Sequence, residues 1–168
     1  YCIDFAFCNR KLMMERIQEV IADSLKGIEF EPMINIAHNY ASLEHHFGND
    51  VIVHRKGATL ASEGIIGIIP GSQGTASYIV KGLGNPDSFC SCSHGAGRVL
   101  SRKSAIKTLD MAKEIANLES KGIVHAIRCQ NDMQEASGAY KDIEEVIANE
   151  LDLVKVKTKL LPIAVIKG

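Results

Sequence analysis

The stretch that decides the fold is residues 65–81, IIGIIPGSQGTASYIVK. Residues 65–69 form an apolar run that is typical of a buried strand, and Pro70-Gly71 ends it. A loop of small residues follows at 71–75, and residues 75–81 read as a second strand. One strand therefore follows another without a helix between them, unlike the alternation of strands and helices in doubly wound folds.

The same mixed order continues on both sides of this stretch. Apolar residues at helical spacing predict a helix over 3–26, with Gly27 as its C-cap. We also expect strands at 33–37 and 51–54, an irregular segment at 82–93, helices at 97–107, 110–120 and 142–149, and closing strands near 151–158 and 160–166. This order predicts an α+β fold with mixed or antiparallel sheets and flanking helices. The glycine motifs of the two common nucleotide-binding folds are missing from the sequence.

Composition sets the broad class of the protein. The chain has 168 residues, of which 46% are hydrophobic, and a formal net charge of −1. This fits one globular domain and leaves any nucleic-acid site to a local basic patch. Five cysteines without a disulfide or zinc spacing favour a reducing, cytoplasmic setting. We expect no membrane partner, because no apolar run approaches roughly 18 residues. Since the chain opens at Tyr1 with no initiator methionine, we expect it to be a fragment.

The strongest chemical signal is SHGAGR at residues 93–98, with Ser101-Arg102 behind it. Histidine is a nucleophile or a metal ligand, and the glycines let backbone N–H groups approach an anion. Arg98 and Arg102 are four residues apart and would share one face of a helix, where they could bind phosphate. The motif therefore indicates a histidine that reacts with a phosphate. A structural histidine in a glycine turn, beside two surface arginines, is the equally weighted alternative.

Two further histidine runs are weaker signals on their own. His38 ends an expected strand and is a plausible metal ligand, whereas His45 and His46 are better explained as an exposed polar turn. The run HRKGAT at 54–59 suits phosphate or a nucleic-acid backbone, but a solvated charge run is the commoner case. The hydroxyl-rich loop at 70–77 could bind a nucleotide, although ordinary turns have the same composition.

Taken together and in order, these runs resemble the C-terminal half of the RtcB-type RNA ligases. The matching runs are HNY at 38–40, HRKGAT at 54–59, IPGSQGT at 69–75, SYIV at 77–80, HGAGR at 94–98 with Ser101-Arg102, AYKDI at 139–143 and Lys167-Gly168. The resemblance covers nearly the whole chain. It implies that residues 1–168 are the C-terminal portion of a single RtcB-like catalytic domain whose N-terminal metal-binding half is absent.

The resemblance also implies an activity. The family joins RNA ending in a 3′-phosphate or 2′,3′-cyclic phosphate to RNA bearing a 5′-hydroxyl, and it uses GTP and manganese. A histidine takes GMP from GTP and passes it to the RNA 3′-phosphate, and the 5′-hydroxyl then displaces GMP. The expected partners are RNA, such as tRNA halves or broken RNA, GTP, and an archease-type activator.

Roles carry over from the family residue by residue. His94 resembles the guanylylated nucleophile and His38 one of the manganese ligands. The nucleotide contacts implied in the same way are Asn39, Ser72, Ser77, Tyr140 and Lys167, with backbone near the ribose or phosphate from Ala96 and Gly97. Weaker RNA or phosphate contacts are Lys56, Arg98 and Arg102. Since the chain holds at most one manganese ligand, two alternatives stay open: a truncated, non-catalytic RNA-binding remnant and a metal-dependent phosphoesterase.

Overall fold

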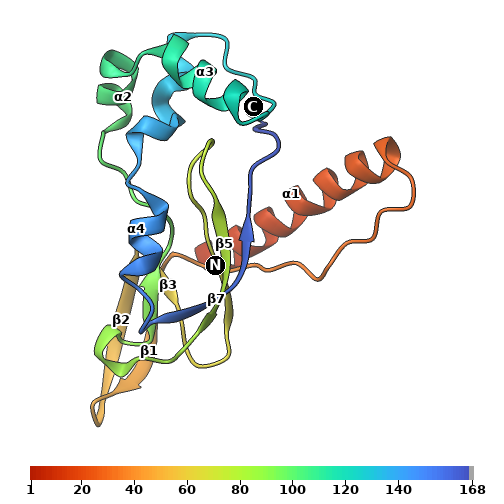
Figure 1. Ribbon diagram of the computed structural model, residues 1–168. Helices are drawn as coiled ribbons and strands as arrows, with labels where there is room; N and C mark the ends of the chain where they lie inside the picture. Colours follow the sequence, from red (N-terminus) through yellow and green to blue (C-terminus); the bar gives the residue numbers. More distant parts are fainter. Residues whose placement is uncertain (167–168) are drawn as a thin grey trace.

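The centre of the fold is a three-stranded antiparallel sheet in the order β4–β5–β7. The computed structural model describes residues 1–166, in which β4 spans Ile66–Ile69, β5 spans Ser77–Gly82 and β7 spans Val154–Leu160 (Figure 1). These three elements confirm the strands predicted at 65–69, 75–81 and near 151–158. The sheets are small and antiparallel and helices flank them, so the predicted α+β class is also confirmed.

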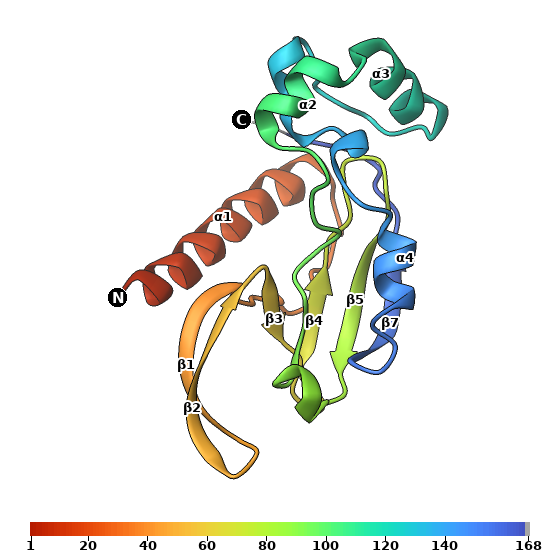
Figure 2. The same cartoon turned by 90° about the vertical axis from the view of Figure 1, so that its left-hand side faces the viewer.

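One face of this sheet carries the hydrophobic core. Side chains alternate along β5, so that Tyr78 and Val80 are buried while Ile79 between them is only partly covered. The helix α4 (Ile143–Ala148) lies beside β5 and β7 in Figure 2 and packs against the buried face. The cluster contains Ile69, Tyr78, Val80, Ile143, Ile147 and Val154. Each large apolar side chain buried there contributes about 1.5–3 kcal/mol, which fixes α4 on the sheet.

A separate antiparallel hairpin extends away from the central sheet (Figures 1 and 2). It consists of β1 (Asn39–His46) and β2 (Asn49–Lys56), joined by Phe47 and Gly48. Both connecting residues have positive φ, 52° and 75°, as a two-residue type I′ turn requires. The strand predicted at 51–54 lies within β2. β1 was not predicted, because its inward positions 42, 44 and 46 are polar and break the usual alternation of apolar and polar residues.

The strand predicted at 33–37 is wrong. These residues are partly buried, but within residues 1–166 they pair with no strand, and residues 33–36 line an apolar groove beside β4, β5 and β7. Their apolar composition therefore reflects side-chain packing rather than membership of a sheet. Short apolar runs do not distinguish between these two cases.

A two-stranded sheet joins the hairpin to the SHGAGR motif. β3 (Ala58–Leu60) continues from β2 and pairs antiparallel with β6 (Ser91–Ser93), with Ala58 opposite Ser93. β6 lies in the segment expected to be irregular at 82–93, so that expectation is wrong at its end. The preceding turn contains a short 3-10 helix, Pro86–Ser88, and then Phe89 and Cys90 with positive φ of 53° and 50°.

Three of the helices lie close to their predicted positions. α1 spans Cys2–Ser24 and α3 spans Met111–Ser120, where Asp110 accepts hydrogen bonds from the N–H groups of Ala112 and Lys113. α4 falls within the helix predicted at 142–149. α2 is Arg102–Thr108 rather than 97–107, because Gly97 has φ of 73° and Ser101 caps the helix through Ser104 N–H.

The end of the described chain differs from the prediction. Residues 160–166 were expected to form a strand, but beyond β7 the chain makes only an isolated parallel bridge between Val124 and Ala164. Pro162 lacks the N–H group that a ladder requires, which accounts for the interruption. Two further 3-10 helices, Gln130–Glu135 and Ser137–Ala139, precede α4. None of the helices within residues 1–166 has both the length and the apolar character needed to cross a membrane.

Candidate functional site

The site is centred on His94, the residue that follows β6. The ring of His94 lies 5.5 Å from the ring of His38, measured between centroids, with 30° between the two planes. His38 precedes β1, and its carbonyl accepts a hydrogen bond of 3.3 Å from Gly57 N–H at the end of β2. A Cβ added at Gly57 would lie 3.7 Å from the His94 ring. The base of the hairpin therefore brings together two histidines that are far apart in sequence.

The surroundings of His94 favour its neutral form. Burial lowers the pKa of His94, the neighbouring His38 lowers it further, and a hydrogen bond with the Gly57 backbone partly opposes both effects. A neutral imidazole has a free lone pair, which a nucleophile or metal ligand requires. The ring lies at a pocket of about 690 Å³ that Gly57, Gly95–Gly97 and Lys141 also line.

The glycines of the motif pack the His94 loop against the hydroxyl-rich loop at 70–77. Ala96 N–H donates to the carbonyl of Pro70 at 2.9 Å, and a Cβ at Gly95 would lie 3.0 Å from that same oxygen. Gly97 has φ of 73°, a conformation that glycine adopts without strain. The motif therefore brings its own backbone beside the loop that carries Ser72 and Ser77.

The serine hydroxyls are held within that loop. Ser72 N–H donates to Thr75 Oγ1 at 2.7 Å, and the hydroxyls of Ser72 and Thr75 are 2.9 Å apart. Ser77 Oγ accepts from Gly71 N–H at 3.2 Å. Gly71 has no room for a side chain, because a Cβ there would lie 2.0 Å from the carbonyl of Ala76. The loop is thus shaped by its own hydrogen bonds, with both predicted contact residues near the His94 motif.

On the other side of the motif, an arginine–carboxylate group joins three predicted contact residues. Arg98 pairs with Tyr140 in an isolated antiparallel bridge, and its guanidinium lies over the Tyr140 ring at 4.9 Å. Glu135 accepts hydrogen bonds from Arg98 Nη1 at 3.1 Å, from Arg102 Nε at 3.0 Å and from the Tyr140 hydroxyl. We call Arg98, Arg102, Glu135 and Tyr140 the Glu135 cluster.

The Glu135 cluster is partly open to solvent, mainly at Arg102. Exposed side-chain fractions are 24% for Arg98, 68% for Arg102 and 30% for Glu135. Burial alone would raise the pKa of Glu135, but hydrogen bonds from Tyr140 and Arg102 and the two positive charges outweigh it and lower that pKa. Glu135 was missed in the sequence, where it stands 37 and 33 residues from its arginine partners in an unremarkable polar run.

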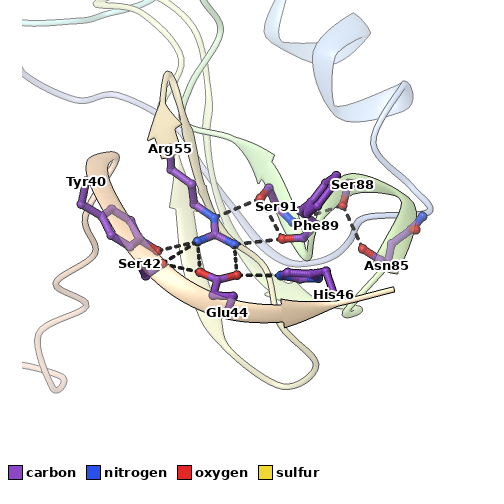
Figure 3. Close-up of polar contacts among 9 residues, drawn as sticks. All are labelled: Tyr40, Ser42, Glu44, His46, Arg55, Asn85, Ser88, Phe89 and Ser91. Atoms are coloured by element: carbon purple, nitrogen blue, oxygen red, sulfur yellow. Dashed lines mark hydrogen bonds and ion pairs between the residues drawn. The ribbon is translucent and has the colours of Figure 1, made fainter. Parts of the chain in front are cut away.

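A second arginine–carboxylate group fastens the hairpin (Figure 3). Arg55 is 1% exposed, so the interpretation of HRKGAT as a solvated charge run is wrong for this residue. Its guanidinium binds both carboxylate oxygens of Glu44, and it also donates to Ser91 Oγ at 3.0 Å and to the carbonyl of Phe89 at 2.9 Å. The Arg55 cluster comprises Tyr40, Ser42, Glu44, His46, Arg55, Phe89 and Ser91.

His45 and His46 were expected to form an exposed polar turn, and this is wrong, because both lie in β1. His45 points outward and pairs with Asp50 at 2.8 Å, with 66% of its side chain exposed. The side chain of His46 is only 9% exposed and bonds to Glu44 at 2.8 Å. Alternation along a strand sends the two neighbouring rings to opposite faces.

The remaining predicted residues lie at the base of the hairpin or outside the described chain. Asn39 and Lys56 face each other in the β1–β2 register, and both are exposed. Lys167 lies outside the described residues. Glu150, which was not predicted, accepts a 2.9 Å hydrogen bond from Ser93 N–H and so supports the residue before His94.

A manganese site is incomplete in this part of the protein. His38 is exposed beside His94, but residues 1–166 contain no group of three or more histidine, cysteine, aspartate or glutamate side chains placed to hold a metal. A catalytic metal commonly has about three protein ligands. The described residues therefore do not complete a manganese site.

Comparison with known proteins gives one consistent result. The family model described as tRNA-splicing ligase RtcB matches residues 1–168. RNA-splicing ligase RtcB1 of Escherichia coli is 44% identical over 173 residues, and RNA-splicing ligase RtcB of Escherichia coli K12 is 42% identical. tRNA-splicing ligase RtcB of Nanoarchaeum equitans is 36% identical over 193 residues. Each match covers 98% of this chain and 40–41% of the relative. The chain thus spans less than half the length of these relatives.

Proposed function

The chain belongs to the RtcB family, and from this premise we propose that it contributes the nucleophilic histidine and part of the nucleotide pocket of an RNA ligase. The observation that carries the proposal is the position of His94, which lies in a glycine loop beside His38 and on a pocket. In the proposed reaction, RNA ending in a 3′-phosphate or 2′,3′-cyclic phosphate is joined to RNA with a 5′-hydroxyl.

The proposed steps can be written for an RNA with a 3′-phosphate. A ring nitrogen of His94 attacks the α-phosphorus of GTP, a nitrogen–phosphorus bond forms, and pyrophosphate leaves. An oxygen of the RNA 3′-phosphate then attacks the same phosphorus and releases the histidine. Finally the 5′-hydroxyl attacks the RNA phosphate, loses its proton and displaces GMP. A histidine adduct suits this relay because it splits one difficult transfer into easier steps.

The surrounding residues support binding of the two phosphate-bearing substrates. We assign Ser72, Ser77, Tyr140 and Asn39 to the nucleotide, together with Lys167 from the family resemblance. The backbone of Ala96 and Gly97 borders the pocket next to His94, where its dipoles can face a phosphate. We assign Arg102, Lys56 and the partly buried Arg98 to RNA or nucleotide phosphates, because positively charged side chains attract phosphate and a guanidinium group binds it with paired hydrogen bonds.

We also propose that His38 is one ligand of a manganese ion. When bound, a metal ion would neutralise phosphate charge and orient the leaving pyrophosphate. Its other ligands must come from outside residues 1–166, since the described residues do not complete a site.

The deciding experiment is labelling with GTP. The protein is incubated with α-labelled GTP and manganese and resolved on a denaturing gel. It is tested both as the 168-residue chain and as a chimera in which this chain replaces the segment it matches in the Escherichia coli relative. We expect a label that is labile in acid and stable in alkali, lost in His94→Ala and retained in His45→Ala, whose ring lies on the exposed face of β1.

Comparison of the 168-residue chain with the chimera distinguishes the ligase proposal from its alternatives. Label in the chimera but not in the chain alone would mean that this segment carries the nucleophile and lacks ligands that the remainder supplies. Label that persists in His94→Ala would refute the assignment of the nucleophile. RNA binding without label in either form would favour the non-catalytic remnant, and release of phosphate from RNA without label would favour a phosphoesterase.

A further inference from the structure

Arg55 joins two parts of the molecule that carry the two histidines. Arg55 itself belongs to β2, and its partner Glu44 belongs to β1, so one end of the contact is in the hairpin. The other end is the turn before β6, where Ser91 Oγ and the carbonyl of Phe89 accept from the guanidinium at 3.0 and 2.9 Å. Figure 3 shows the guanidinium between these two elements.

Only short stretches of chain separate the contacts of Arg55 from His94 and His38. On the hairpin side, Arg55 is opposite Tyr40 in the register, and the next positions toward the base lead to His38 and Gly57. On the other side, β6 runs from Ser91 to Ser93 and His94 follows directly. A shift of the hairpin relative to the turn at Phe89 would therefore change the separation between His38 and His94.

Burial and several hydrogen bonds around Arg55 oppose such a shift of the hairpin. The Arg55 side chain is 1% exposed and the Glu44 side chain 19% exposed, so water competes little with their bonds. The hydroxyl of Tyr40 accepts from Arg55 Nη1 at 3.2 Å, and the Tyr40 ring lies 5.6 Å from the guanidinium carbon. His46 bonds to Glu44 Oε2 at 2.8 Å, and its ring lies against that of Phe89 with centroids 5.0 Å apart and 59° between the planes.

We propose that Arg55 is a positioning residue for the proposed histidine chemistry, which sets the separation between His38 and His94 by fixing the β1–β2 hairpin to the turn before β6. The effect of Arg55 on catalysis rests on the proposed function of His94, whereas its effect on the separation between His38 and His94 does not. Arg55 touches neither histidine and has no place in the reaction itself. It acts only through the elements that it joins.

The first test is spectroscopic and needs no activity. In the 168-residue chain with labelled histidines, proton contacts between the His38 and His94 rings are measured by NMR, together with contacts inside the β4–β5–β7 sheet. Arg55→Met keeps most of the side-chain volume and removes every hydrogen bond. We expect it to weaken the His38–His94 contact, which the pairing of Ala58 with Ser93 still partly maintains, and to leave the sheet contacts unchanged. Arg55→Lys keeps the charge and should weaken the contact less.

The matched control is Arg16→Met. Arg16 also pairs with a glutamate, Glu19, but it lies on the exposed surface of α1 away from the histidines. This variant should preserve the ring contact in full. Should Arg55→Met fail to fold, Arg55→Lys provides the comparison. A folded Arg55 variant whose ring contact equals that of Arg16→Met would overturn the inference.

The second test measures labelling by GTP in the form of the protein that labels. At saturating GTP, Arg55→Met should slow adduct formation by on the order of 100-fold, because small misplacements of reacting groups have effects of this size. The GTP concentration that gives half the maximal rate should change much less than the rate, since Ser72, Ser77 and Tyr140 lie outside the hairpin. A rate equal to that of Arg16→Met, or a loss explained only by weaker GTP binding, would overturn the inference. If the wild type never labels, the proposed function fails while the ring contact still decides the role of Arg55.

Discussion

The Arg55 cluster and the Glu135 cluster use the same chemistry on opposite sides of the His94 loop. In each, one glutamate accepts from an arginine guanidinium and a tyrosine hydroxyl lies beside the pair. They differ in exposure, because Arg55 is 1% exposed while Arg102 is 68% exposed. The buried group can only hold the chain together. Only in the more open group do we expect a phosphate to compete with the carboxylate.

Exposure also sets what each ion pair contributes to stability. Removing one partner of a buried pair leaves the other charge without compensation, whereas exposed pairs contribute little because water and salt screen them. The hydrogen bond from Arg55, ahead of the opposing effect of burial, lowers the pKa of Glu44 to about 2. The pKa of Glu135 is lowered too, although burial acts against the shift.

The largest expected difference between the clusters is in stability. Glu44→Ala should lower the free energy of unfolding by about 3–5 kcal/mol, because Arg55 remains buried without its counter-charge. Arg102→Ala should lower it by about 1 kcal/mol or less, since this pair is largely exposed. Urea unfolding of the chain followed by circular dichroism measures both values. Equal losses would mean that burial does not distinguish the two clusters.

The next difference is in the response to acid. Glu44 has a folded pKa of about 2, below its ordinary value of 4.5. Its contribution to stability is therefore fully present above the ordinary value and is lost as the pH falls through about 2. The groups that face Glu44 are Arg55, which stays charged throughout, and His46.

The pH dependence is measured as the free energy of unfolding of the wild type and of Glu44→Gln between pH 6 and pH 2. The difference in this free energy between the two proteins should narrow as the pH drops below the ordinary carboxyl range. Glu135→Gln should show a smaller gap over the same range, since Glu135 is the more open carboxylate. A gap for Glu44→Gln that does not change with pH would contradict the role of the carboxylate charge.

The smallest expected effect concerns RNA. In the Glu135 cluster the carboxylate pairs with Arg98 and Arg102, but Arg98 also donates to the carbonyls of Leu100 and Gln134. Glu135→Gln should therefore free mainly Arg102 for phosphate and tighten RNA binding by a few-fold at low salt. Fluorescence anisotropy with a short RNA ending in a 3′-phosphate measures the affinity. Glu44→Gln is the matched control in the buried cluster and should leave affinity unchanged. Weaker binding by Glu135→Gln would show that Glu135 orients the arginines instead of competing with phosphate.

The same contrast explains how much could be predicted from the sequence. Periodicity found α1, α3, β4 and β5, because each of these elements follows a regular apolar pattern. It missed β1, whose inward face is polar because it binds the Arg55 guanidinium. Motif chemistry selected His94 and His38, and the structure places their rings 5.5 Å apart.

What the sequence could not provide were partners across long separations. Arg55 and Ser91 are 36 residues apart, and Arg98 and Glu135 are 37 apart. Partners this far apart in the sequence produce no local sequence pattern. From the sequence, Arg55 therefore resembled a surface cation and Glu135 an ordinary acidic residue. Burial is a property of the folded chain, and it distinguishes Arg55, which holds the hairpin against the turn before β6, from the more exposed Glu135 cluster.

The isolation of α1 has a consequence for the dynamics of the chain. This 23-residue helix has no buried residue and projects from the rest of the molecule (Figure 2). Asn35 ties α1 to the following segment, accepting a hydrogen bond from Arg10 and donating one to the carbonyl of Phe7. The amide protons of α1 should therefore exchange with solvent far faster than those of β5. Its first turns border His38 across a shared pocket, so local opening there would expose one face of the site.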